Sequence, residues 1–396
     1  MTTGDASLVI APARPAPWRD PKIRAIAYQI LFVAGVLGFI GFLVHNTLAN
    51  IGRQNIATGF GFLHKEAAFG IGESLIAYSP ADTYGRAFLV GLTNTLHVAA
   101  LGVVLATILG TVMGLARLSG NWLIAKLAQV YVETFRNIPL LLQLFFWWGL
   151  LNKMAPGPRQ AWRILPDVYV SNRGVVYPVP VASPAYKWVG LAFLAGIVVT
   201  VVVRRWAKRR QMATGRQFPV GWVGLGLITG LPALVFLTAG APLALDVPSL
   251  KGFNFAGGSS MSPEFSALLI GLVVYTGTFI SEIVRSGVLA VSWGQSEAAM
   301  ALGLKPSQRM RLVVLPQALR VIVPPMTSQY LNLTKNSSLA VAIGFPDLVS
   351  IANTTMNQTG QAVEGIMLIM GVYLFISLSI SLAMNLYNRA VALVER

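Results

Sequence analysis

Residues 292–316 read Ser-Trp-Gly-Gln-Ser-Glu-Ala-Ala-Met-Ala-Leu-Gly-Leu-Lys-Pro-Ser-Gln-Arg-Met-Arg-Leu-Val-Val-Leu-Pro, and this polar, basic stretch lies between two apolar segments. Ser292 and Gln295 have the spacing of a capping box, which predicts the start of a helix. Gly303 favours a left-handed residue that ends this helix, and Pro306 suits the first turn of a second one. The stretch therefore predicts two short helices folded about a glycine, a shape suited to docking with another protein.

The composition indicates an integral membrane protein. The chain has 396 residues, of which 55% are hydrophobic and only 11% are charged, whereas soluble domains carry roughly 25% charged residues. A net charge of +16 would suggest nucleic-acid binding in a soluble protein, but in a membrane protein it indicates basic cytoplasmic loops. The absence of cysteine excludes disulfides, thiolate metal ligands and cysteine nucleophiles.

Eight stretches are long and apolar enough to span a membrane, which takes about 20 residues. The first is preceded by basic residues and is too long for a cleavable signal. Basic residues in 1–24 and a cluster at Arg204–Arg216 place both segments in the cytoplasm. With an even number of spans, both termini are then cytoplasmic. The expected spans are about 25–45, 86–115, 127–151, 187–203, 219–239, 265–289, 321–344 and 363–387.

Two outer segments have distinctive patterns. Residues 46–85 include a partly amphipathic stretch, 60–78, that is expected to lie along the membrane surface. Residues 152–186 form a loop rich in proline and aromatic residues. Its basic residues oppose the positive-inside rule; they are Lys153, Arg159, Arg163 and Arg173.

The spacing within 292–316 resembles the EAA loop of ABC importer permeases. In that family, Glu-Ala-Ala is followed by three residues, a glycine, nine residues, an aliphatic residue, any residue and Leu-Pro. Every position matches, with Val313 for the more usual isoleucine. The resemblance implies a coupling helix that docks in a groove of a separate ATP-binding subunit; a solvated amphipathic linker is the alternative. The coupling residues implied are Glu297, Ala298, Ala299, Gly303, Leu315 and Pro316.

Three further stretches resemble permeases of the polar amino-acid uptake family. Residues 135–143 match its Phe-Arg-x-x-Pro-Leu-Leu-x-Gln pattern, and residues 335–339 its Lys-Asn/Asp-Ser/Thr-Ser-Leu pattern. Residues 281–287 resemble its Ala-Glu-Ile-x-Arg-Gly-Gly pattern, from which Ser281 and Ser286 depart. With a long outer segment after the first span, the whole plan most resembles a membrane subunit of the general L-amino-acid importer.

The resemblance implies an all-α membrane fold with a five-helix importer-permease core. The core is expected in two parts, 86–151 and 264–390, the second of which contains the loop 292–316. The additions are a cytoplasmic basic N-terminus at 1–24, an extra span at 25–45, a periplasmic segment at 46–85, and an insertion with two extra spans at 152–263.

Charged residues inside spans are costly and need an explanation. Glu133 and Arg136 lie three residues apart, as do Glu282 and Arg285, so each pair can share a helix face. They can line a polar route for the zwitterionic head group of an amino acid. They can also be structural pairs, an interpretation favoured by their position near the cytoplasmic ends of the spans.

Four polar residues lie well inside the seventh expected span: Lys335, Asn336, Ser337 and Ser338. Small polar residues and broken helices often line transport paths, so these residues are candidates for the substrate path. Hydrogen bonding between helices is the alternative.

The chain has no Gly-x-x-x-x-Gly-Lys-Ser/Thr phosphate loop, and no metal-ligating or nucleophilic constellation. We therefore expect no catalytic residue, cofactor or metal on this chain, with ATP and Mg²⁺ on a partner ATPase. The expected function is that of a permease subunit that translocates L-amino acids across the bacterial inner membrane. The expected partners are an ATP-binding subunit dimer, a second related permease, a periplasmic amino-acid-binding protein and membrane lipid.

Two other functions remain open. An ion-coupled secondary transporter would use Glu133, Glu282 or His97 as its ion site, but it leaves the 292–316 loop without a role. A membrane assembly subunit would have no substrate path. Dependence of uptake on ATP or on an ion gradient separates the first alternative from the ABC importer.

Overall fold

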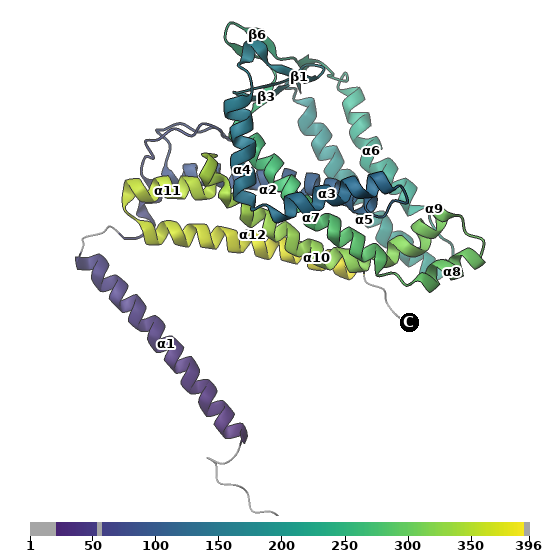
Figure 1. The fold of residues 1–396 in the computed structure, drawn as a ribbon, viewed down its shortest axis with the longest axis horizontal. Coiled ribbons are helices and arrows are strands. Elements are labelled where there is room, and N and C mark those ends of the chain that lie inside the picture. The colour runs from purple at the N-terminus through teal and green to yellow at the C-terminus, as the bar shows by residue number, and fades with distance from the viewer. Residues whose placement is uncertain (1–20, 54–57, 392–396) are drawn as a thin grey trace, which may run out of the picture.

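The computed structural model describes residues 21–53 and 58–391, and most of them are helical (Figure 1). The expected basic N-terminus, 1–24, lies almost wholly outside the described residues. The helices are α1 (Pro21–Arg53), α2 (Tyr84–Ala116), α3 (Trp122–Asn137), α4 (Leu140–Gly149), α5 (Ala185–Thr214), α6 (Val220–Thr238), α7 (Pro263–Leu289), α8 (Trp293–Ala301), α9 (Pro306–Arg309), α10 (Leu315–Asn336), α11 (Leu348–Thr359) and α12 (Ala362–Val391).

Six described helices are long and apolar enough to cross a membrane, namely α1, α2, α5, α6, α7 and α12. The helical run Pro306–Ile343 and α11 meet at a bend of 51° and add a seventh if they form one broken span. The stretch 127–151 does not form the single helix expected, because it divides into α3 and α4. The count of eight spans and the cytoplasmic position of both termini stay predictions.

The break between α3 and α4 has a local cause. A residue before proline is pushed out of the helical region, and Ile138, before Pro139, is extended with φ −93° and ψ 127°. Gln143 Nε2 donates to the carbonyl oxygens of Phe135 at 2.8 Å and Ile138 at 3.0 Å. The stretch 135–143 therefore encodes both a helix break and the side chain that satisfies the carbonyl groups freed by it.

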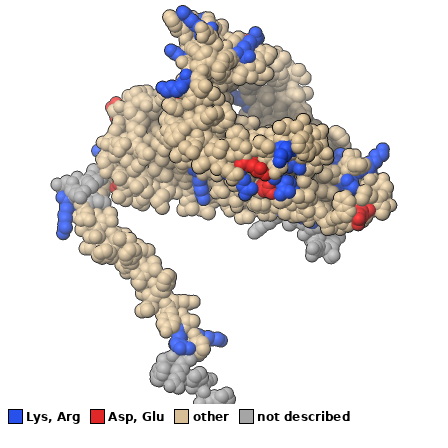
Figure 2. Space-filling view, in the orientation of Figure 1, with Lys and Arg blue, Asp and Glu red and all other residues tan. Residues whose placement is uncertain are grey.

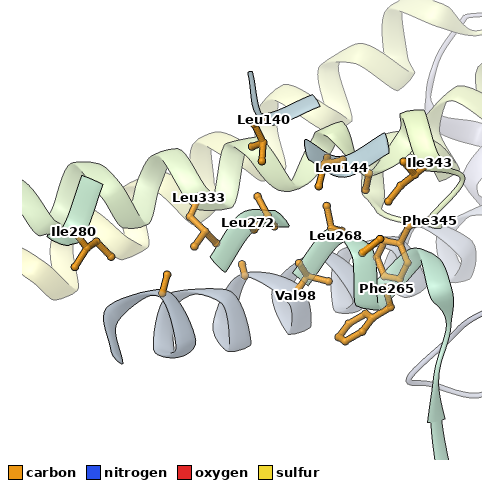
Figure 3. Packing of buried hydrophobic residues seen from close by; sticks show 14 of the residues in the cluster. Val98, Leu140, Leu144, Phe265, Leu268, Leu272, Ile280, Leu333, Ile343 and Phe345 are labelled. Atoms are coloured by element: carbon orange, nitrogen blue, oxygen red, sulfur yellow. The ribbon is translucent and has the colours of Figure 1, made fainter. Parts of the chain in front are cut away.

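Helix α7 lies at the centre of the bundle and packs against α2, α10, α4 and α3. Glycines allow α2 to approach it closely. A Cβ built on Gly110 would lie 2.5 Å from Ile280 Cβ, and one on Gly114 would lie 2.7 Å from the Ser281 carbonyl oxygen. Small residues at helix contacts are typical of membrane proteins. The buried core around α7 includes Val98, Leu140, Leu144, Phe265, Leu268, Leu272, Leu333 and Phe345 (Figure 3).

The predicted helical membrane fold is confirmed, and the loops between the helices add a small antiparallel sheet that the sequence did not indicate. Residues 152–186 supply three of its strands and the segment before α7 supplies the fourth, in the order β1-β2-β3-β8. Strands of two to four residues are too short for alternation to be recognised in the sequence. The strands are β1 (Trp162–Leu165), β2 (Val168–Ser171), β3 (Gly174–Tyr177), β4 (Val179–Pro180), β5 (Leu245–Asp246), β6 (Ser249–Lys251), β7 (Asn254–Ala256) and β8 (Ser259–Met261).

Helices α5 and α6 pack chiefly against each other. At their contact, a Cβ built on Gly196 would lie 2.6 Å from the Leu227 carbonyl oxygen, so the two backbones come close together. Helix α5 continues to Thr214, beyond the expected end of the span at 203. The five basic residues between positions 204 and 210 therefore lie in a helix.

Residues 58–83 form a mostly irregular segment, and the position of 60–78 along the membrane surface stays a prediction. Asn94 of α2 is 2% exposed, and its Nδ2 donates to the carbonyl oxygens of Glu73 at 2.8 Å and Pro346 at 2.9 Å. The segment is thus tied to the bundle. In Figure 1 it lies with α11 at one end of the long helices, and α8 and α9 lie at the opposite end.

Candidate functional site

Within the 292–316 loop, α8 ends in two hydrogen bonds that turn the chain at a glycine. The backbone N–H of Leu304 donates to the Ala299 carbonyl oxygen at 3.1 Å, and that of Gly303 donates to the Met300 carbonyl oxygen at 2.9 Å. This pattern is a Schellman cap. Gly303 has φ +71°, a left-handed value that costs glycine little. The prediction of two short helices folded about Gly303 is confirmed.

The predicted capping box is wrong. The Ser292 side chain makes no bond to the start of α8, and the Gln295 backbone N–H donates instead to the Ser292 carbonyl oxygen at 3.1 Å. At the second helix, Gln308 Oε1 accepts from the Lys305 backbone N–H at 3.0 Å. A side-chain cap therefore occurs one helix later than the sequence suggested.

The second half of the loop joins α10 without interruption. A π turn, Met310–Val314, follows α9 and leads directly into α10. In a regular α-helix, Pro316 would lack an N–H for the Leu312 carbonyl group and its ring would clash with that group; the wider π turn accommodates the proline. Gln317 Nε2 donates to Gln295 Oε1 at 3.3 Å, so α8 is also tied to the first turn of α10.

The loop has a buried side and an exposed side. Ala299 and Val314 are 3% and 6% exposed, and α8 packs on the π turn. Trp293 is 68% exposed and Leu302 is 81% exposed. Exposed apolar patches mark contact sites for proteins or membranes. The remaining predicted coupling residues are also exposed: Glu297, Ala298, Gly303, Leu315 and Pro316.

Glu282 and Arg285 form an ion pair within α7, with Glu282 Oε1 and Arg285 Nη2 at 2.6 Å. The other carboxylate oxygen of Glu282 bonds Nη1 of Arg117, at the end of α2. One carboxylate thus joins α2 to α7 near the end that carries α8, which supports the structural interpretation of this pair. The sequence showed Arg117 only as a loop residue, because its partner lies 165 positions away.

Glu133 and Arg136 are oriented differently. Glu133 Oε1 accepts from Gln129 Nε2 at 2.6 Å, and the Arg136 guanidinium carbon lies 5.2 Å from the ring centroid of Phe279. Both charged side chains are exposed. Figure 2 shows acidic and basic side chains gathered over α3 and the adjoining part of α7. A route for substrate at these residues stays a prediction.

The four polar residues of the seventh expected span lie where α10 gives way to a 3₁₀ helix. Ser337 is fully buried, and its hydroxyl donates to the Thr334 carbonyl oxygen at 2.7 Å. The Ser338 hydroxyl donates to the Lys335 carbonyl oxygen at 2.7 Å. Asn336 is half-buried and Lys335 is exposed. Both hydroxyls are thus bonded within their own helical run, and contact with a substrate stays a prediction.

Comparison with known proteins places the chain in a family. Residues 102–393 match the model of the family "Binding-protein-dependent transport system inner membrane component". The chain is 52% identical over 377 residues to the general L-amino acid transport system permease protein AapQ of Rhizobium johnstonii, which covers 95% of this chain and 94% of the relative. It is 52% identical over 381 residues to the putative amino-acid ABC transporter permease protein YhdX of Escherichia coli, covering 95% and 96%.

A third relative is the glutamate/glutamine/aspartate/asparagine transport system permease protein BztB of Rhodobacter capsulatus. It is 42% identical over 409 residues, covering 95% of this chain and 96% of the relative. The relatives therefore align along nearly the whole chain. The chain is a multi-pass inner membrane protein and belongs to the family of inner membrane components of binding-protein-dependent transport systems.

Proposed function

We propose that this chain is a permease subunit of an ABC importer that translocates L-amino acids across the bacterial inner membrane. The observation that carries the proposal is the 292–316 loop, two short helices folded about Gly303 with an exposed apolar surface. The names of its relatives, which are amino-acid permeases 42–52% identical to it, support the substrate class.

In this proposal a separate ATP-binding subunit dimer docks on the loop, binds ATP and Mg²⁺, and hydrolyses ATP. Ala298 is small and exposed, so a partner surface can approach the backbone of α8 closely. Glu297 presents a carboxylate to a basic or hydrogen-bonding group of the partner. Trp293 and Leu302 supply the exposed apolar area that a stable interface needs. A second, related permease chain and an external amino-acid-binding protein complete the transporter.

The loop is built to transmit motion. It joins α7 to α10, and the π turn continues into α10 with no flexible link. ATP binding draws the two ATPase subunits together, and the two coupling loops move with them. Because α7 is packed tightly on α2 at Gly110 and Gly114, displacement of α7 carries its neighbours and opens the path outward. Substrate shifts this equilibrium only through a difference in its affinity for the two states.

Neither alternative function is favoured. Glu282, one of the residues that an ion-coupled transporter would use, is already bonded to Arg117 and Arg285. The loop also has no role in that mechanism.

The substitution Gly303→Val tests the proposal, because a β-branched residue is strained at φ +71°. We expect the ATPase subunit to be lost on co-purification, or ATP-driven amino-acid uptake to fall more than about tenfold, while the chain still inserts in the membrane. The matched control is Gly215→Val at the end of α5, where φ is +69° and the space is equally open. Normal ATPase retention and normal uptake in the Gly303→Val transporter would contradict the proposal.

A further inference from the structure

A polar cavity of about 420 Å³ lies beside the Arg117–Glu282–Arg285 network. Three of its six lining residues are cationic, and Glu282 is the carboxylate that bonds two of them. Glu133 also lies nearby, since it accepts a hydrogen bond from the lining residue Gln129. Cations therefore exceed carboxylates around the cavity. Its lining residues are Arg117, Trp122, Ala125, Lys126, Gln129 and Arg285.

The guanidinium group of Arg285 has an unused donor. Its Nη2 is bonded to Glu282 at 2.6 Å, but its Nε is buried and has no hydrogen-bond partner among the described residues. A buried donor without an acceptor costs free energy. This buried Nε does not itself reach the cavity, but Arg117, Lys126 and Arg285 line it with cationic groups. An anion with several oxygens would balance part of this charge, and phosphate suits such a site because it accepts several charge-assisted hydrogen bonds.

The surroundings place the cavity at the level of lipid headgroups. It lies at the turn from α2 to α3, on the side that the positive-inside rule assigns to the cytoplasm. Trp122 is 75% exposed, and tryptophan is enriched at membrane–water interfaces. Leu123 and Leu127 on the same helix are 56% and 62% exposed, so α3 presents an apolar surface beside the polar cavity. Basic pockets between spanning helices on this side of a membrane suit anionic headgroups.

We propose that this cavity binds a phosphate group, with the headgroup of an anionic phospholipid as its source; free inorganic phosphate has the same chemistry and is separated by the test. The bound phosphate contacts cations from α2, α3 and α7 together. It therefore holds these three helices together at the end of α7 that leads into the 292–316 loop. This inference does not depend on the proposed function, because it concerns lipid binding by the chain itself.

Two variants probe the site without replacing any residue of the Arg117–Glu282–Arg285 network. Lys126→Gln removes one cation, and Ala125→Asp places a carboxylate in the cavity lining in competition with the ligand. The matched control is Lys208→Gln, which removes an exposed cation from α5. Native mass spectrometry of the detergent-solubilised transporter, titrated with phosphatidylglycerol or phosphatidylcholine, measures the fraction of complexes that carry lipid. A parallel titration adds inorganic phosphate.

We expect phosphatidylglycerol to bind in preference to phosphatidylcholine, and its apparent affinity to fall about three- to tenfold in Lys126→Gln and Ala125→Asp but not in Lys208→Gln. If millimolar inorganic phosphate leaves the bound lipid in place, the lipid is the source of the phosphate; if it displaces the lipid in the wild type alone, the site takes the free anion. Equal phosphatidylglycerol binding by the wild type and by both cavity variants would overturn the proposal.

Discussion

Arg117, at the end of α2, and Glu282, in α7, bond side chain to side chain across 165 positions of sequence. Glu282 also bonds Arg285, one turn further along α7, so one carboxylate is shared by two guanidinium groups and one positive charge of the three-residue network is left over. The three side chains are 14%, 29% and 31% exposed, and water therefore screens the network in part. The network holds the end of α2 against α7, next to the 292–316 loop.

Glu282→Gln should destabilise the chain more than Arg285→Gln. Loss of the carboxylate leaves two guanidinium groups close together with no counter-charge, whereas loss of Arg285 leaves the bond between α2 and α7 intact. We expect a cost of about 1–3 kcal/mol for Glu282→Gln and less than about 1 kcal/mol for Arg285→Gln. Thermal unfolding in detergent, followed by tryptophan fluorescence, measures both. Equal losses would show that the bond to Arg117 contributes little.

Gly110→Ala should destabilise the contact between α2 and α7. The added Cβ would lie 2.5 Å from Ile280 Cβ, and overpacking of this kind typically costs about 1–3 kcal/mol. The control is Gly226→Ala in α6, where nothing lies within 4 Å of the added atom. There, alanine should be neutral or stabilise the helix by about 0.5–1 kcal/mol. Gly110→Ala should lower the unfolding temperature, and Gly226→Ala should leave it unchanged or raise it. An unfolding temperature for Gly110→Ala that is no lower than that of Gly226→Ala would argue against close packing at Gly110.

Gln143→Leu should weaken the join between α3 and α4. Gln143 is 3% exposed and donates to two carbonyl oxygens at the break, and leucine leaves both without this partner. We expect a loss of about 2–4 kcal/mol, as two buried hydrogen bonds are removed, and faster hydrogen exchange around the break. Gln211→Leu, at an exposed position of α5, is the matched control. Unchanged exchange in Gln143→Leu would refute the capping role.

Glu73→Gln should make stability less dependent on pH. Burial raises the pKa of Glu73 above its usual 4.5, the hydrogen bond from Ser262 opposes this shift, and nearby Glu264 adds to it. The folded state therefore holds the proton more tightly than the unfolded chain. The stability due to this group is greatest at low pH and falls as pH rises from about 4.5 through the folded pKa.

Glutamine cannot ionise, and its side-chain oxygen can still accept from Ser262. The variant should thus gain stability relative to the wild type as pH rises, and unfolding temperatures measured from pH 4.5 to pH 8 report the difference. Curves that stay parallel over this range would show that Glu73 does not titrate as inferred.

The amino-acid sequence alone indicated most of the architecture. Apolar runs of about 20 residues must form helices in a membrane because the bilayer interior offers no other partner for backbone polar groups, and this located α1, α2, α5, α6, α7 and α12. The end of α8 at Gly303 could also be predicted, because the left-handed backbone conformation there depends on the glycine itself. The spacing of residues 297–316 also pointed to the family that the comparison with known proteins confirmed.

Only the tertiary structure decided how separate stretches meet. The break at Pro139 had a local cause, but its cap by Gln143 depends on the path the chain takes afterwards. Sheet strands of a few residues leave no period to recognise, and β8 pairs with β3 across more than 80 intervening positions. The bond between Glu282 and Arg117, at the end of α2, could not be predicted either, because the two residues lie 165 positions apart. A sequence determines which groups must be buried or bonded, whereas contacts between distant residues follow from the packing of whole helices.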